Sequence, residues 1–187
     1  MEPDGLVGFA LDKDHREMVL NNRDKISNLV GVYFEVVYPI FPLFHRRTLL
    51  RKIVARDYLR DRALFATVMS ICALCSARIR DGALPSGRWD PTYFSQPSAE
   101  IFLAAARDVL PTELADLRGM DYMRCCAMLA LYSIQVGRTE IMHQYLGLYH
   151  ALIAMDGMHD EKNWPDTGIV ELELRRRLVC YDFNPMF

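Results

Sequence analysis

The stretch that decides the fold is residues 120–159, MDYMRCCAMLALYSIQVGRTEIMHQYLGLYHALIAMDGMH. From 121 to 136 the only charged residues are Asp121 and Arg124, which predicts a helix that is apolar nearly all round and therefore central. A second helix is expected over 139–155. Because only a short turn separates the two, they are expected to pack as an antiparallel helical hairpin.

Four residues are expected to mark the ends of these two helices. Asp121 is a good N-cap for the first helix, and Gly137 stands where a left-handed residue usually follows a helix. Thr139 is expected to cap the second helix, and Gly157 to end it. These signals place the boundaries of the hairpin close to 121, 136, 139 and 155.

Gly147 interrupts the second helix with a residue that is unfavourable in a helix interior, by about 1 kcal/mol against Ala. Ala127 and Ala130 in the first helix are also small. We therefore expect the two helices to approach closely there, with Gly147 at the crossing.

The rest of the chain also predicts helices and no strand, because its apolar residues recur at helical spacing and nowhere alternate convincingly. Further helices are expected over 24–37, 48–55 (capped by Thr48), 57–79, 98–110 and from 169 onward. A polar loop is expected over 81–97. The run FATVMSICALCSA is apolar throughout and should be buried. The predicted fold is all-α, an irregular multi-helix bundle around the hairpin.

Composition narrows the function classes. The chain has 187 residues, a net charge of −2 and a pI of about 6.2, which argues against a surface devoted to nucleic acid. Charged residues throughout the first twenty positions do not fit a signal peptide, and no charge-free run of membrane length appears. Five cysteines in apolar surroundings suggest a reducing, intracellular compartment.

A family resemblance begins with the segment LVGVYFEVVYPIFPLFHRRTLL, residues 29–50. It resembles the opening of the middle homology region of fungal-specific transcription factors. The residues that carry this likeness are Tyr33, Phe34, Tyr38, Pro39, Phe41, Pro42, His45 and Arg46. The family often has Pro where this chain has Arg47.

Four later segments continue the resemblance in the family's order. FATVMSICALCSARI is similar to its alanine-rich second element, and IFLAAARDVL to its short helix with Phe, Ala, Arg and Leu. The hairpin is similar to its paired helices, and VELELRRRL to its Glu-x-x-x-Arg-Arg-Arg-Leu element. The matching residues in the last two are Gly137, Arg138, Gly147, Gly157, His159, Glu171, Arg175, Arg176, Arg177 and Leu178.

The resemblance implies transcription regulation in the nucleus, as a helical regulatory and partner-binding region, and a regulator of secondary metabolism is one such role. Partners would belong to the transcription machinery or be a second copy of the chain, and a small-molecule effector is another. The family usually carries a zinc cluster of six cysteines that binds DNA. This chain's cysteines, Cys72, Cys75, Cys125, Cys126 and Cys180, lack that spacing. We expect no enzyme activity, cofactor, metal, membrane contact or DNA binding from this chain alone.

Several residues are candidates for metal-binding, redox or phosphate-binding sites. Cys72 and Cys75 form a C-x-x-C pattern that can bind metal or exchange electrons, but its mid-helix apolar setting favours core packing. His143 and His150 lie two turns apart, about 10 Å along a helix, which is too far to share one ion. His159 sits beside acidic residues without a completing motif. The basic run 46–62 is more typical of a solvated helix face than of a phosphate site.

Three parts are expected along the chain. Residues 1–22 form a loose N-terminal arm with at most one short helix, 23–178 the helical domain similar to part of the family region, and 179–187 a divergent tail. Val179 and Cys180 can be encoded by a fungal splice-donor sequence, so we hypothesise that the tail comes from a retained intron and that the chain is truncated. Leu174 and Leu178 would then be exposed. We expect one or two arginines of 175–177 to pair with Glu171 or Glu173.

Two other function classes remain open at this stage. One is a helical interaction adaptor with no link to transcription, which a pull-down without nuclear partners would favour. The other is a small helical enzyme with an apolar pocket, which would need a cavity lined by convergent polar groups.

Overall fold

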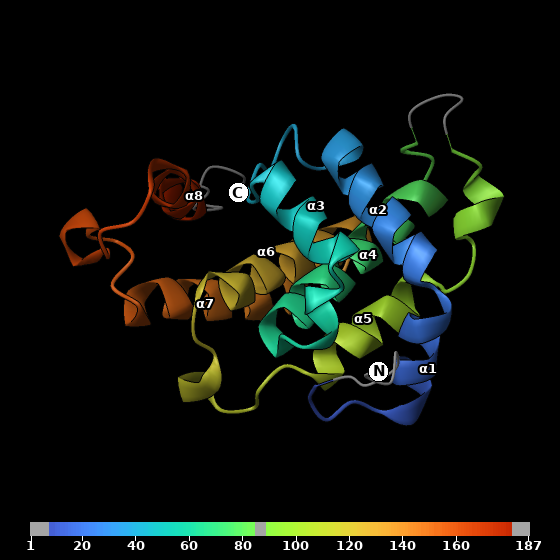
Figure 1. Ribbon diagram of the computed structural model, residues 1–187, viewed down its shortest axis with the longest axis horizontal. Helices are drawn as coiled ribbons and strands as arrows, with labels where there is room; N and C mark the ends of the chain where they lie inside the picture. The colour runs from blue at the N-terminus through green and yellow to red at the C-terminus, as the bar shows by residue number, and fades with distance from the viewer. Residues whose placement is uncertain (1–7, 85–88, 181–187) are drawn as a thin grey trace.

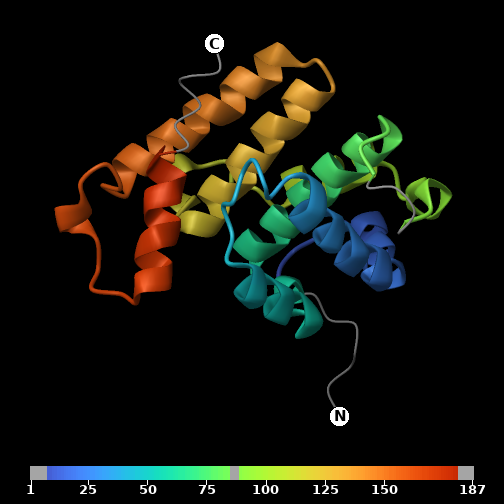
Figure 2. The same cartoon turned by 90° about the horizontal axis from the view of Figure 1, so that it is seen from above.

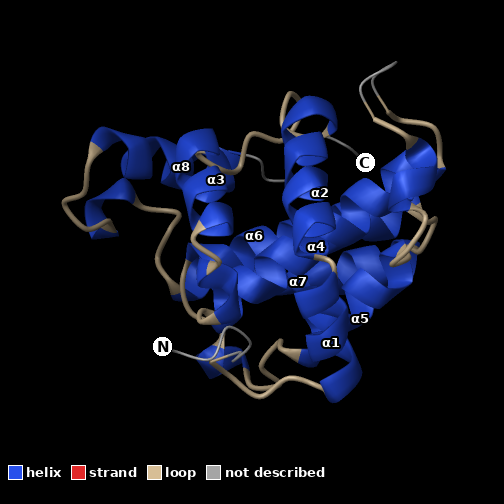
Figure 3. Ribbon diagram, turned by 45° about the vertical axis from the view of Figure 1, so that its right-hand side comes forward, coloured by secondary structure: helices blue, strands red, loops and turns tan. Residues whose placement is uncertain are grey.

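Helices make up all the regular structure in residues 8–84 and 89–180, the part of the chain that the computed structural model describes (Figures 1 and 3). The α-helices are α1 (Lys13–Asn21), α2 (Arg23–Val36), α3 (Arg46–Val54), α4 (Arg62–Arg80), α5 (Ala99–Asp108), α6 (Met120–Gln135), α7 (Thr139–Met155) and α8 (Ile169–Cys180). Short 3-10 helices cover Asp57–Leu59, Pro91–Phe94, Leu114–Asp116 and Glu161–Asn163. The described residues contain no strand, so the predicted all-α class is confirmed.

Helix α4, rather than the predicted hairpin, is the centre of the structure. Fifteen of its nineteen residues are buried, and it packs against α2, α5 and α6. Its length and composition would also suit a membrane span, but 83% of that apolar stretch is buried inside the protein, as in a core helix. The expected helix over 57–79 is two elements, because Asp61 caps α4 by accepting a hydrogen bond from the Leu64 amide at 3.1 Å.

The hairpin of α6 and α7 forms as predicted, and Figure 2 shows the two helices side by side. Gly137 has a φ of 71°, and the Arg138 amide donates back to the Ser133 carbonyl at 2.8 Å, which closes α6 with a left-handed cap. The expected caps at the helix starts are wrong. The cap positions belong to Gly119 and Arg138, while Asp121 turns instead toward Arg124.

The expected close crossing at Gly147 is also wrong. Gly147 is exposed, and a Cβ built on it would meet no atom within 4 Å. The buried residues of α7 are Met142, Leu146, Tyr149 and Leu152, spaced three or four apart, and these face the body of the protein. Gly147 lies off this stripe, on the outer face of α7.

Residues 8–22 are not the loose arm that was expected, although residues 1–7 lie outside the described part. Phe9 packs its ring edge-on against Phe65, with 5.2 Å between ring centres, and Val19 is fully buried. The Asp12 amide donates to the Asp108 carboxylate at 3.0 Å. Two apolar residues and a hydrogen bond between residues far apart in the sequence therefore attach this segment to the body.

Helix α8 begins at Ile169, where the sequence predicted it, and lies against the hairpin and the 39–45 connection. Leu174 and Leu178 are 8% and 0% exposed, so the expectation that they face solvent is wrong. The Leu178 carbonyl accepts a hydrogen bond from the Tyr149 hydroxyl, which fixes this end of the helix. The exposed apolar residues of α8 are instead Ile169 and Val170, at 81% and 47%. The proposed divergent tail lies outside the described residues from 181 onward.

Candidate functional site

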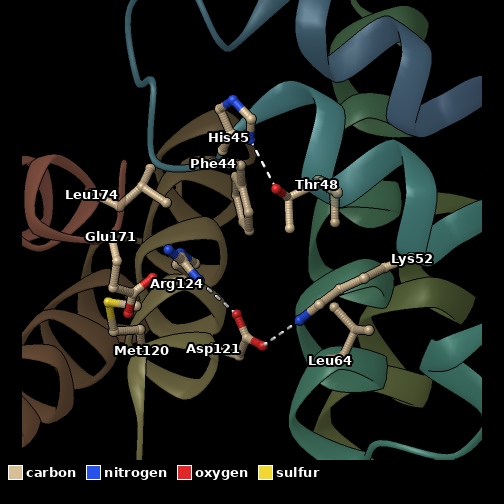
Figure 4. A pocket seen from close by; sticks show the side chains of 11 residues that line it. Phe44, His45, Thr48, Lys52, Leu64, Met120, Asp121, Arg124, Glu171 and Leu174 are labelled. Atoms are coloured by element: carbon tan, nitrogen blue, oxygen red, sulfur yellow. Dashed lines mark hydrogen bonds and ion pairs between the residues drawn. The ribbon is translucent and has the colours of Figure 1, made fainter. Parts of the chain in front are cut away.

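A hollow of about 280 Å³ opens where α3, α6 and α8 meet (Figure 4). It combines polar groups from three elements with an apolar wall. Its lining residues are Phe44, His45, Thr48, Leu49, Lys52, Leu64, Met120, Asp121, Arg124, Glu171 and Leu174. We call it the Arg124 hollow.

The connection between α2 and α3 places the upper wall of this hollow. Proline at positions 39 and 42 prevents α2 from continuing. The Tyr33 hydroxyl donates to the Phe41 carbonyl at 2.8 Å, and the Tyr33 ring meets the Phe44 ring edge-on at 5.4 Å. Burial raises the pKa of Tyr33 well above its usual value, so the hydroxyl stays protonated and keeps donating. The aromatic residues thus hold Phe44 and His45 at the edge of the hollow.

Helix α3 starts two residues earlier than expected, and Thr48 is inside its first turn rather than at its cap. The Thr48 hydroxyl lies 2.8 Å from the Nδ1 of His45, the residue before the helix. This contact fixes the imidazole at the mouth of the hollow. Lys52, one turn later, projects into the same space.

Arg124 is the charged residue most deeply placed in this site, at 8% exposed. Its Nε donates to the Leu43 carbonyl at 3.0 Å, and its Nη1 to the Asp121 carboxylate at 2.7 Å. The guanidinium also lies over the Phe44 ring, 5.3 Å from the ring centre. Among the described residues, Nη2 has no hydrogen-bond partner.

Asp121 stands between two cations. Its second oxygen lies 3.8 Å from the Lys52 Nζ, beyond ordinary hydrogen-bond length, so Lys52 keeps donors available. Glu171 enters from α8 and pairs with Arg175 at 3.3 Å, and no ion pair joins it to Arg124 within the described residues. The lining therefore holds two cations and two carboxylates beside His45.

A second hollow of about 290 Å³ adjoins the first and shares Phe44, His45 and Leu174 with it. Its other lining residues are Tyr38, Ile169, Val170, Glu173 and Arg177. Arg177 pairs with Glu173 at 3.0 Å and donates to the Pro42 carbonyl at 3.4 Å, which joins α8 to the connection. The two hollows together are called the α8 groove.

The structure brings one subset of the family-motif residues together at the groove. His45, Glu171 and Arg177 line it, and Tyr33, Phe41 and Pro42 support its wall. Phe34 lies under the Arg46 guanidinium, 5.4 Å from its centre, and Pro39 is exposed. The remaining motif residues also line neither hollow: Gly137, Arg138, Gly147, Gly157, His159, Arg175 and Arg176.

The three arginines of α8 are more fully paired than expected. Arg175 and Arg177 pair with Glu171 and Glu173 one turn away. Arg176 makes two hydrogen bonds to Glu161, at 2.8 and 2.9 Å, which the sequence did not predict. This pairing lowers the pKa of Glu161 and ties α8 to the loop before it.

The cysteine pairs pack in the core, as the apolar setting predicted. Cys72, Cys75, Cys125 and Cys126 are fully buried. Burial raises the pKa of these thiols, for Cys126 to about 12, which keeps them protonated and unreactive. His143 and His150 are exposed on α7. Within the described ranges, no three His, Cys, Asp or Glu residues gather as a metal site would require.

The sequence reasoning missed Lys52, Asp121 and Arg124 as site residues. A signal was present, because an acidic and a basic residue three positions apart in an otherwise apolar helix must be satisfied inside the protein. What the sequence did not indicate is that α3 and α8 complete the site around them. No protein-family model, curated protein or solved structure matches the chain.

Proposed function

We propose that this chain is a regulatory, partner-binding helical region similar to that of fungal-specific transcription factors, and that the α8 groove is its binding site. The observation that carries the proposal is the meeting of His45 and Glu171 in one hollow. They come from the first and last segments of the resemblance. A motif whose two ends build one hollow is what a binding region would require.

The groove favours binding over catalysis. Its best candidate for covalent chemistry is the Thr48 hydroxyl beside the His45 ring. A hydroxyl nucleophile needs a base that a third group orients, and no carboxylate contacts His45 in the described part of the chain. The remaining ionisable groups are held in ion pairs. These contacts support the regulatory proposal against the alternative of a small enzyme.

The exposed apolar residues beside the groove support partner binding as well. Ile169 and Val170 lie at its rim and are largely exposed. The α8 helix that carries them is attached through Leu174, Leu178 and a few polar contacts. An apolar rim around a polar hollow can contact a partner protein or enclose a small effector.

A tethering experiment tests this function. The chain is fused to a heterologous DNA-binding domain in a fungal reporter strain, and transcription is compared with that of the DNA-binding domain alone. We expect a several-fold change in reporter output, lost in Val170→Arg at the groove rim. Met155→Arg is the matched control, because Met155 is a similarly exposed apolar helix residue, at 38%, and lines neither hollow.

Two outcomes would contradict the proposal. One is reporter output equal to that of the DNA-binding domain alone at equal protein abundance. The other is an equal response of the Val170 and Met155 variants. A pull-down that recovers partners without any nuclear or transcriptional protein would favour the adaptor class instead.

A further inference from the structure

We propose that the Arg124 hollow binds a free α-amino acid with an apolar side chain, in its zwitterionic form. This inference rests on the proposed function, since it names the effector class for the same groove. It follows from three features of the hollow: a buried cation with a free donor, a lining that carries both charges, and apolar walls of limited size.

The first feature is the unused donor of Arg124. Its side chain is more than nine-tenths buried, and the protein satisfies its Nε and Nη1. Nη2 has no partner among the residues that the structure describes, yet Arg124 lines the hollow. A guanidinium donor that is accessible from such a hollow is well suited to a carboxylate, which accepts a charge-assisted hydrogen bond. The Leu43 carbonyl and the Phe44 ring hold the guanidinium in place for such a contact.

The start of α6 adds to the attraction for a carboxylate. Met120 and Asp121, which line the hollow, are the first residues of this sixteen-residue helix. The cap residue Gly119 offers no side chain to the free amides. The positive end of the helix dipole therefore faces the same side of the hollow as Arg124.

The second feature is that the lining carries both charges, which favours a ligand that also carries both. Lys52 and Arg124 are cations, and Asp121 and Glu171 are carboxylates, so a carboxylate on the ligand has carboxylates as well as cations for neighbours. An ammonium group on the same ligand offsets that repulsion. Glu171 is suited to receive it, because its Oε1 contacts Arg175 while its Oε2 has no partner in the described residues. Arg124 and Glu171 both face the hollow without pairing (Figure 4).

The third feature is the apolar wall and the size. Phe44, Leu49, Leu64, Met120 and Leu174 line the hollow between its charged groups. Pockets for drug-sized ligands usually span roughly 300–1,000 Å³, and this hollow holds about 280 Å³. A small metabolite with one apolar branch fits this volume.

Calorimetric titration of the purified full chain tests the inference. The probes are L-leucine, L-methionine and L-phenylalanine, each titrated separately. We expect at least one to bind with a Kd below about 1 mM. Two truncated probes accompany leucine: 4-methylpentanoate, which lacks the ammonium group, and 3-methylbutylamine, which lacks the carboxylate. Each is expected to bind at least tenfold more weakly than leucine, because each lacks one of the two ionic contacts.

Glu171→Gln tests the ammonium contact on a residue that is partly exposed and therefore tolerant of change. It is expected to weaken amino-acid binding about tenfold, as loss of one ionic contact would. It should not weaken 4-methylpentanoate binding, because this probe has no ammonium group and the substitution removes a nearby negative charge. Glu173→Gln is the matched control. It is also on α8 and also paired with an arginine, but it does not line the Arg124 hollow, so amino-acid binding should be unaffected.

Arg124→Lys tests the carboxylate contact. It keeps the charge and removes the planar fork, so both leucine and 4-methylpentanoate should bind more weakly. Circular dichroism checks that this variant of a buried residue folds. If it does not fold, the comparison of Glu171→Gln with Glu173→Gln still tests the inference. The inference is overturned if none of the three amino acids binds, or if 4-methylpentanoate binds as tightly as leucine. Because calorimetry measures binding without transcription, the tethering experiment tests the proposed function separately. If no amino acid binds but the tethering result is as expected, the inference fails and the proposed function remains supported.

Discussion

The inner helices α4 and α6 differ sharply from the outer helices α7 and α8. Fifteen of nineteen residues are buried in α4 and twelve of sixteen in α6, against four of seventeen in α7 and two of twelve in α8. Burial of apolar surface is the main favourable term in folding. The inner pair therefore determines the fold, while the outer pair is attached by narrow stripes and a few polar contacts.

The α8 groove lies on the boundary between these two layers. Its floor is the start of α6, which the core fixes, and one wall is α8, which is attached by few contacts. A rigid floor would position Arg124 for the proposed ligand. A lightly held wall would let α8 change position at little energetic cost if the proposed partner binds there.

The largest expected effect separates the two layers by the same substitution in each. Leu74→Ala in α4 removes a fully buried side chain and leaves a cavity, so the free energy of unfolding should fall by about 2–5 kcal/mol. Leu174→Ala in α8, where the side chain is 8% exposed beside an existing hollow, should cost clearly less. Urea denaturation measures both, and equal losses would contradict the two-layer view.

A smaller effect tests how α8 is held. Tyr149→Phe removes the hydroxyl that donates to the Leu178 carbonyl and should cost about 1 kcal/mol. We expect the loss to be local, so amide exchange should accelerate in α8 while α4 amides remain protected. Uniform acceleration across both helices would instead show that α8 unfolds only with the core.

The smallest effect concerns the exposed face of α7. Gly147→Ala should raise the free energy of unfolding by about 0.4–1 kcal/mol, because the site is helical and open. Gly82→Ala should lower the free energy of unfolding, because Gly82 has a φ of +87°, which side-chain-bearing residues avoid. Thermal melts compare the two. A destabilised Gly147 variant would restore the close crossing that the sequence suggested.

The sequence predicted the burial of the inner layer well, because a continuously apolar run such as FATVMSICALCSA is stable only where it is buried on all sides. The prediction from sequence failed where the same residue type can be present for more than one physical reason. The sequence suggests that Gly147 allows two helices to pack closely, but this glycine lies on the solvent-exposed face of α7. Leu174 and Leu178 were expected to be exposed, although Phe44 and Tyr149, distant in sequence, lie beside them.

The candidate site could be predicted only in part. The resemblance included the aromatic and proline residues of 33–46, several of which support the wall of the groove, and it also included His45 and Glu171. Lys52, Asp121 and Arg124 were not identified, because their roles depend on the relative placement of α3, α6 and α8. Helix boundaries follow from local signals, whereas a hollow between three helices depends on long-range packing.

The contact of α1 with α5 has a consequence for the order of folding. The Asp12 amide and the Asp108 carboxylate are separated by 96 residues, and closing a flexible loop of that length costs about 4 kcal/mol in chain entropy. The contact therefore forms efficiently only after α4 and α5 have paired and shortened the effective loop. We expect α1 to dock last. Pulse-labelled hydrogen exchange during refolding would show α1 amides protected later than those of α4, and simultaneous protection would contradict this order.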